Sequence, residues 1–91
     1  MWWFICQGSE LLVVNAEEDV LLPKERSATP LKMTPVRTQF LGYLESCPCV
    51  AAEIEAGAVL PDGMRWGSLR SLHGVLPEAL FAIAARAVQL I

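Results

Sequence analysis

The spacing of apolar residues changes once along this chain, close to Trp66, and that change limits the possible folds more than any other feature. Before it, polar and apolar residues alternate with a period of two, most clearly over 36–45 and 49–55, as half-buried strands do. After it, the apolar residues follow a helical spacing. Strands followed by helices are typical of an α+β layer arrangement. We therefore predict an α+β fold: a mixed, mainly antiparallel sheet of five or six strands with two C-terminal helices.

The first half of the chain predicts two hairpins. An aromatic segment (2–6) and an aliphatic segment (11–14) flank a Gly8-Ser9 turn, and the segments 36–45 and 49–55 flank a second turn. Strict alternation in the third of these segments would place Val36, Thr38, Phe40, Gly42 and Leu44 on one face and Arg37, Gln39, Leu41, Tyr43 and Glu45 on the other.

The segment between the two hairpins predicts a short strand (20–22) that ends at Pro23, followed by a long loop over 23–35 that we expect to be mobile. A second turn is predicted at Leu60-Pro61-Asp62-Gly63, because proline presets φ and glycine accepts a positive φ.

The last third of the chain predicts two helices. Ser68 is suited to cap a short helix over 69–73 that stops at Gly74, and Pro77 is suited to the first position of a second helix that runs to the end. The apolar stripe of the second helix is wide, which predicts burial on more than one side. Because this helix ends on Leu90-Ile91 without a stop signal, we expect the chain to be a fragment of a longer protein.

Length and composition exclude several classes of protein. With 91 residues the chain forms one domain over 1–91, and a hydrophobic content of 54% excludes a disordered tail. The net charge of −3 makes nucleic acid an unlikely partner, and the absence of a long apolar run argues against a membrane span. Three cysteines, an odd number, favour a reducing cytoplasm. The high apolar fraction indicates a partner domain or subunit.

Cysteine and acidic residues offer weak candidates for metal binding or catalysis. Cys47-Pro48-Cys49 has one residue between its thiols and no second pair, so buried or turn cysteines are favoured over a zinc site. Glu17-Glu18-Asp19 could hold a hard cation, but a solvated turn explains these residues as well. Glu53 and Glu55 could act as paired carboxylates, although the outer face of a hairpin also accounts for them.

Histidine, arginine and tryptophan give further candidates. His73 could be a general base, but a surface position is favoured because no nucleophile lies at a recognisable spacing. Three arginines could bind phosphate, with ion pairs to the acidic residues as the favoured alternative: Arg65, Arg70 and Arg86. Three tryptophans could stack on bases, and adjacent Trp2 and Trp3 would face opposite sides of a strand, so that one is core: Trp2, Trp3 and Trp66.

Three stretches, in order, resemble the amino-terminal part of bacterial NADH pyrophosphatases of the Nudix superfamily. They are Trp2-Trp3 leading through Leu11-Leu12-Val13-Val14 to Leu22-Pro23-Lys24, then Gly67-Ser68-Leu69-Arg70, and then the helical segment 80–90. The resemblance implies a degenerate Nudix-like fold, followed in the longer chain by a four-cysteine zinc ribbon and the catalytic Nudix domain. It also implies a parent that hydrolyses NAD(H) to NMN(H) and AMP and in some cases removes NAD caps from RNA.

The resemblance implies a non-catalytic domain that supports folding, domain packing or dimerisation. Divalent metal (Mg or Mn) and structural Zn belong to the parent, and the partners are its remaining domains and a second copy. Glu17-Glu18 lacks the Arg-Glu and Gly of the Nudix box, and Cys47 and Cys49 are not the zinc ligands, so no catalytic, cofactor-binding or metal residue is carried over. Two alternatives remain open: a freestanding protein-interaction module, and a small nucleotide-binding module that uses Arg65, Trp66 and Arg70.

Overall fold

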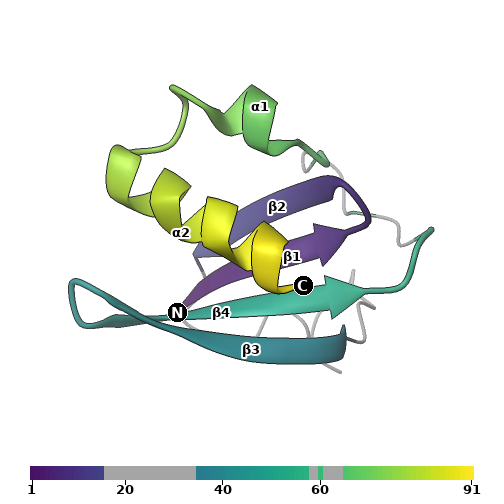
Figure 1. Ribbon diagram of the computed structural model, residues 1–91, viewed down its shortest axis with the longest axis horizontal. Helices are drawn as coiled ribbons and strands as arrows, with labels where there is room; N and C mark the ends of the chain where they lie inside the picture. The colour runs from purple at the N-terminus through teal and green to yellow at the C-terminus, as the bar shows by residue number, and fades with distance from the viewer. Residues whose placement is uncertain (16–34, 58–59, 61–64) are drawn as a thin grey trace.

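The residues that the structure describes form one four-stranded sheet with two helices on one side of it. The computed structural model describes residues 1–15, 35–57, 60 and 65–91. The elements are, in order, β1 (Trp2–Gln7), β2 (Glu10–Asn15), β3 (Pro35–Leu44), β4 (Cys47–Ile54), α1 (Leu69–Leu72) and α2 (Glu78–Leu90). Strands followed by helices confirm the α+β prediction (Figure 1).

The sheet has the order β2-β1-β4-β3. β1 pairs antiparallel with β2 and β3 pairs antiparallel with β4, so both predicted hairpins form. The two hairpins meet where β1 runs parallel to β4, from Trp2 opposite Cys49 to Cys6 opposite Glu53. The sheet is therefore mixed and mainly antiparallel, as predicted.

The prediction of five or six strands is wrong for the part of the chain that the structure describes, which contains four. The segment proposed as a further strand (20–22), most of the 23–35 loop and the turn at 61–63 lie outside the described residues. A short apolar run such as 20–22 has too few residues for periodicity to establish a strand.

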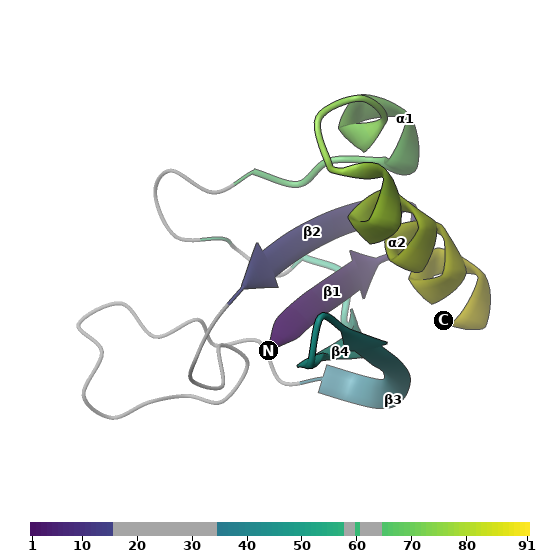
Figure 2. The same cartoon turned by 90° about the vertical axis from the view of Figure 1, so that its left-hand side faces the viewer.

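Two separate apolar clusters fill the two faces of the sheet. Figure 2 shows α2 lying along one face of the sheet. On that face, Phe4, Cys6, Cys49 and Ala51 pack with residues of the helix. The helix contributes Leu80, Ala84 and Ala87, and the two alanines are fully buried. Their small side chains let α2 lie close to the sheet, since any longer side chain there would need space that the packed core does not have.

The opposite face of the sheet has its own cluster. Trp3, Ile5, Ala52 and Ile54 are buried there, and Trp66 packs against them. A sheet that buries residues on both faces explains why β1 is apolar without a break from Trp3 to Cys6.

β3 departs from strict alternation, and the predicted division of its faces is wrong. A register shift between Phe40 and Gly42 adds one residue to the strand, so that Phe40 lies opposite Val50 and Tyr43 lies opposite Pro48. Val50 and Pro48 are two residues apart and share a face, so Phe40 and Tyr43 also share one. Their rings meet edge to face with centroids 5.3 Å apart.

The helices begin as the sequence predicts, with one shift. Ser68 and Ser71 form a reciprocal capping box at the start of α1, and Gly74 follows its end with a φ of +83°. Pro77 is the N-cap of α2 and not its first residue. α2 packs on the sheet and also borders the α1 segment through Leu69, Leu72 and Leu76, which confirms burial on two sides. Among the described residues, no helix has the length and apolarity needed to cross a membrane.

Candidate functional site

A hollow opens between the first turn of α2 and the tip of the β3–β4 hairpin. It has a volume of about 360 Å³ and is partly open to solvent. Its lining comes from every strand and from the start of the helix: Trp2, Asn15, Leu44, Glu45, Cys47, Pro77, Ala79 and Leu80. We call it the α2 hollow.

The sheet brings together the strand residues that line the α2 hollow. Trp2 begins β1 and lies directly opposite Asn15, the last residue of β2, in the antiparallel register. Leu44 and Cys47 face each other across the end of the second hairpin. Because β1 pairs with β4, these two hairpin ends lie next to each other at the same end of the strands.

The turn that carries Glu45 has an unusual backbone. Glu45 and Ser46 connect β3 to β4 and have φ values of 49° and 68°. A two-residue hairpin turn with two positive φ angles matches the twist of the strands, but it normally takes Asn-Gly or Gly-Gly. The side chains of Glu45 and Ser46 therefore cost conformational energy here, and they place a carboxylate at the rim of the hollow.

The helical wall of the α2 hollow is the first turn of α2. Pro77 makes no side-chain hydrogen bond to the first-turn N–H groups, and Glu78 is the acidic residue of that turn. Ala79 and Leu80 line the hollow, so the wall combines apolar side chains with the partial positive charge of a helix start.

The three cysteines differ in their surroundings. Cys6 and Cys49 are buried, whereas Cys47 is partly exposed at the hollow. Burial, with a smaller effect of the Glu53 carboxylate, raises the pKa of the Cys6 thiol to about 11. Burial, together with Cys47, also raises the pKa of Cys49, whose Sγ donates to the carbonyl oxygen of Cys47 at 3.7 Å. Cys6 and Cys49 are therefore neutral structural thiols at pH 7.

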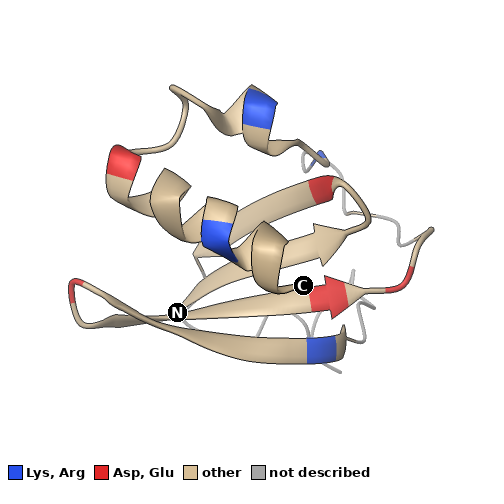
Figure 3. Ribbon diagram, viewed as in Figure 1, with Lys and Arg blue, Asp and Glu red and all other residues tan. Residues whose placement is uncertain are grey.

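The described residues do not fit the divalent metal or the zinc that the family resemblance implies for the parent. No group of three or more His, Cys, Asp or Glu side chains lies close enough together in this part of the chain to hold an ion. Figure 3 shows the acidic positions spread over separate elements. Glu53 is in an ion pair with Arg37, and Glu55 lies beyond the end of β4. Glu17-Glu18-Asp19 lies outside the described residues.

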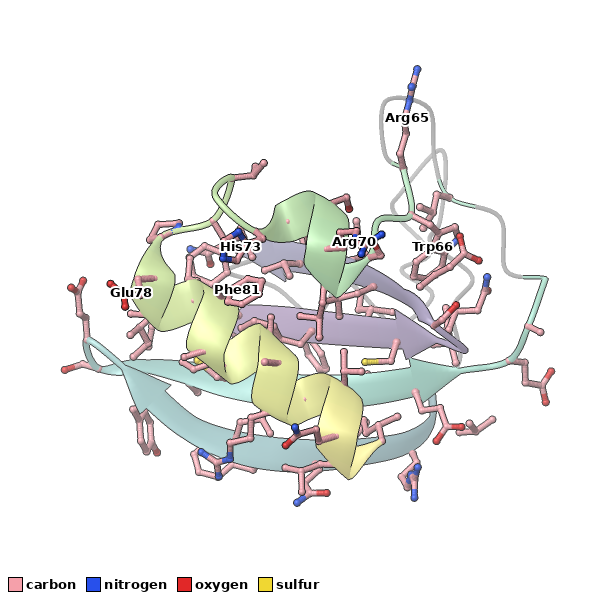
Figure 4. The ribbon with its side chains drawn as sticks, turned by 45° about the horizontal axis from the view of Figure 1, so that its top comes forward. Arg65, Trp66, Arg70, His73, Glu78 and Phe81 are labelled. Atoms are coloured by element: carbon pink, nitrogen blue, oxygen red, sulfur yellow. The ribbon has the colours of Figure 1, made fainter. Side chains whose placement is uncertain are left out.

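The arginine and tryptophan candidates do not form one site. Arg65, Arg70 and Arg86 are exposed and come from a loop, α1 and α2, and Figure 4 shows Arg65 projecting away from Arg70. Trp66 packs against the apolar cluster of the far sheet face. Trp2 and Trp3 contact different clusters, which confirms that they face opposite sides, and Trp3, with 7% exposure, is the core residue.

His73 is an exposed residue at the end of α1, which confirms the predicted surface position. Its ring packs edge to face on Phe81 of α2 with centroids 5.2 Å apart (Figure 4). This contact fastens the loop between the two helices.

Sequence reasoning missed the α2 hollow itself. Asn15, Glu45 and Pro77 are far apart in the chain and form no motif. The parallel pairing of β1 with β4 brings Asn15 and Glu45 to one end of the sheet, and the packing of α2 on the sheet adds Pro77. The strand ends carried the only available signal, since polar residues at strand ends often line a site.

Comparison with known proteins gives one match. A protein-family model described as "NUDIX-like: NADH pyrophosphatase-like rudimentary NUDIX domain" matches residues 1–91, the full length of the sequence. No curated protein and no solved structure matches the chain. The four-stranded mixed sheet with its C-terminal helices is thus the fold of a chain that belongs to the family of NADH pyrophosphatase-like rudimentary NUDIX domains.

Proposed function

We propose that this chain is the non-catalytic amino-terminal domain of a cytoplasmic NADH pyrophosphatase, and that it acts by packing against the rest of that enzyme or against a second copy. The parent would hydrolyse NAD(H) to NMN(H) and AMP with Mg or Mn, would hold structural Zn in its own later segment, and would remove NAD caps from RNA. The family match supports this proposal.

The observation that carries the packing role is the apolar outer surface of β3. Val36, Phe40 and Tyr43 are 57%, 55% and 70% exposed, although all three are large apolar side chains. Aromatic residues are enriched in protein interfaces and charged residues are depleted there. The register shift in β3 turns the rings of Phe40 and Tyr43 to the same side of the sheet. Such irregularities are common where a strand redirects a side chain next to a functional site.

The end of α2 lies over the other face of β3, because Arg37 pairs with Glu53 on the helix-covered face whereas Phe40 pairs with Val50 on the opposite one. A guanidinium nitrogen of Arg37 in β3 donates to the carbonyl oxygen of Ile91 at 2.7 Å, so the helix end is fastened to the edge strand. In the proposed parent, the zinc ribbon follows α2 and would therefore begin near Arg37 at the β3 side of the sheet, on the face opposite to Phe40 and Tyr43.

The first test is enzymatic. The purified chain is incubated with NADH and Mg²⁺ or Mn²⁺, and NMNH and AMP are measured by chromatography. We expect no product above the rate without protein. Formation of NMNH and AMP faster than in the absence of protein would contradict the non-catalytic assignment.

The second test addresses the packing surface. Sedimentation compares the wild-type chain with the double variant Phe40→Ser/Tyr43→Ser, alone and mixed with a separately expressed zinc ribbon and catalytic domain. We expect association in at least one mixture and its loss in the double variant. Val75→Ser is the matched control, because Val75 is 72% exposed but lies between the helices, away from β3. Monomers in every mixture would overturn the proposal.

A further inference from the structure

We propose that the α2 hollow binds a neutral, amino-substituted aromatic heterocycle, such as the base of a purine nucleoside. This site is independent of the packing surface on β3, and nothing in the family assignment places a ligand in it.

The size and the apolar lining of the hollow select a small ring system. A volume of about 360 Å³ lies at the lower end of the range for small-molecule sites, so the hollow suits a single ring system and not an extended chain. Most of its lining is apolar, and it includes the indole of Trp2. An indole offers a flat face on which any heteroaromatic ring can stack.

The polar atoms of the hollow lie at its rim and match a ring that carries both donors and acceptors. The carboxylate of Glu45 only accepts hydrogen bonds, and the amide of Asn15 both donates and accepts. An exocyclic amino group can donate to Glu45, while a ring nitrogen can accept from Asn15. A hydrocarbon ring would leave both partners unused, so the pair favours an amino-substituted heterocycle.

The opposing charges around the hollow favour an uncharged ligand. Its lining contains the Glu45 carboxylate and no Lys or Arg side chain, so the carboxylate disfavours a phosphate group inside the hollow. In the other direction, the first turn of α2 carries partial positive charge and disfavours a full cation next to Ala79 and Leu80. These two effects leave a neutral ring as the favoured occupant, with any phosphate of the ligand outside in solvent.

Cys47 provides a direct readout, because it lines the hollow while Cys6 and Cys49 are buried. The full chain is treated with iodoacetamide in the presence of increasing adenosine, and alkylation of each cysteine is followed by mass spectrometry. We expect saturable protection of Cys47 in the micromolar to millimolar range. Inosine, which has a carbonyl in place of the amino group, should protect at higher concentration only, and ribose 5-phosphate should not protect.

Substitutions at exposed glutamates separate binding from folding. Glu45→Gln keeps the shape of the side chain but weakens the hydrogen bond to the amino group, and we expect adenosine to bind about tenfold more weakly. Glu55→Gln, at an exposed position beyond β4, should leave binding unchanged. Circular dichroism of both variants checks that they are folded.

Three results would overturn the proposal. They are a Cys47 alkylation rate that adenosine does not change, protection by ribose 5-phosphate equal to that by adenosine, and equal binding by wild type and Glu45→Gln. Because none of these depends on the packing surface, they leave the proposed function untouched.

Discussion

The guanidinium of Arg37 contacts the carboxylate of Glu53 on the neighbouring strand. Its Nε donates to Oε2 of Glu53 at 3.0 Å, and a terminal nitrogen lies 2.8 Å from the same oxygen. The same side chain donates to the carbonyl oxygen of Ile91. One arginine thus joins β3, β4 and the end of α2, where a positive charge is also favourable to the helix dipole.

Replacement of this arginine should weaken the domain modestly. We expect Arg37→Gln to lower the free energy of unfolding by about 1 kcal/mol, because the ion pair is partly exposed and such pairs contribute little, while the helix end also loses a cation. Urea denaturation at low and high salt measures the effect, which should shrink as salt rises. Thr38→Ala, on the same exposed strand, is the control. This role would be contradicted if Arg37→Gln lost no more stability than Thr38→Ala, or if its loss were the same at low and high salt.

The buried alanines of α2 should not accept larger side chains. Ala84 is fully buried against the sheet, so Ala84→Leu must displace the helix or the strands, and we expect a loss of about 1–3 kcal/mol in stability. Ala82 lies in the same helix but is exposed, and Ala82→Leu should cost less than about 0.5 kcal/mol. Thermal denaturation of both variants tests the contrast. Equal melting temperatures would mean that α2 does not lie as close to the sheet as described.

Stability should fall with rising pH through the titration of Cys6. Burial raises the pKa of the Cys6 thiol to about 11 in the folded state, whereas an exposed thiol has a pKa of about 9.0. Well below pH 9 the Cys6 thiol is protonated in both the folded and the unfolded state, so its titration does not change the stability. Between pH 9 and 11 only the unfolded state releases the proton, so unfolding becomes easier as pH rises.

The cysteine contribution is isolated by comparison with Cys6→Ala across this pH range. Other groups titrate there too, but they are common to both proteins. We expect the stability difference between wild type and variant to narrow from pH 9 to pH 11. A difference that stays constant would mean that Cys6 titrates normally.

A glycine in the β3–β4 turn should stabilise the domain. Ser46 has a φ of 68°, which glycine adopts without strain, so Ser46→Gly should raise the free energy of unfolding by about 1 kcal/mol. Ser9 occupies the turn of the first hairpin without a positive φ, and Ser9→Gly should be neutral or destabilising. Denaturant midpoints give the comparison, and an equal response of both turns would refute the explanation.

The sequence predicted the parts of the fold that depend on local patterns. The cap at Ser68, the glycine stop at Gly74 and the two hairpins follow from residue spacing and turn chemistry, and all are present. Local patterns could not show that the two hairpins meet along β1 and β4, because that contact joins segments distant in the chain.

The shift in β3 and the α2 hollow were beyond prediction for related reasons. Phe40 and Tyr43 share a face only because of one extra residue in the strand, and neither side chain signals such an insertion by itself. Asn15 at the end of β2 and Glu45 in the β3–β4 turn have no evident role in the sequence, and only the fold places them on one cavity. The sequence indicated the family, but the chemistry of its residues alone did not identify a site.

The parallel contact between β1 and β4 has a consequence for synthesis on the ribosome. The residues from Trp3 to Gln7 are all buried in the finished domain, yet one of their two neighbouring strands, Cys47–Ile54, is translated much later. A nascent chain therefore exposes the open side of an aromatic strand for many elongation cycles. Such a strand readily joins with other chains, so premature termination before Cys47 should yield an insoluble product.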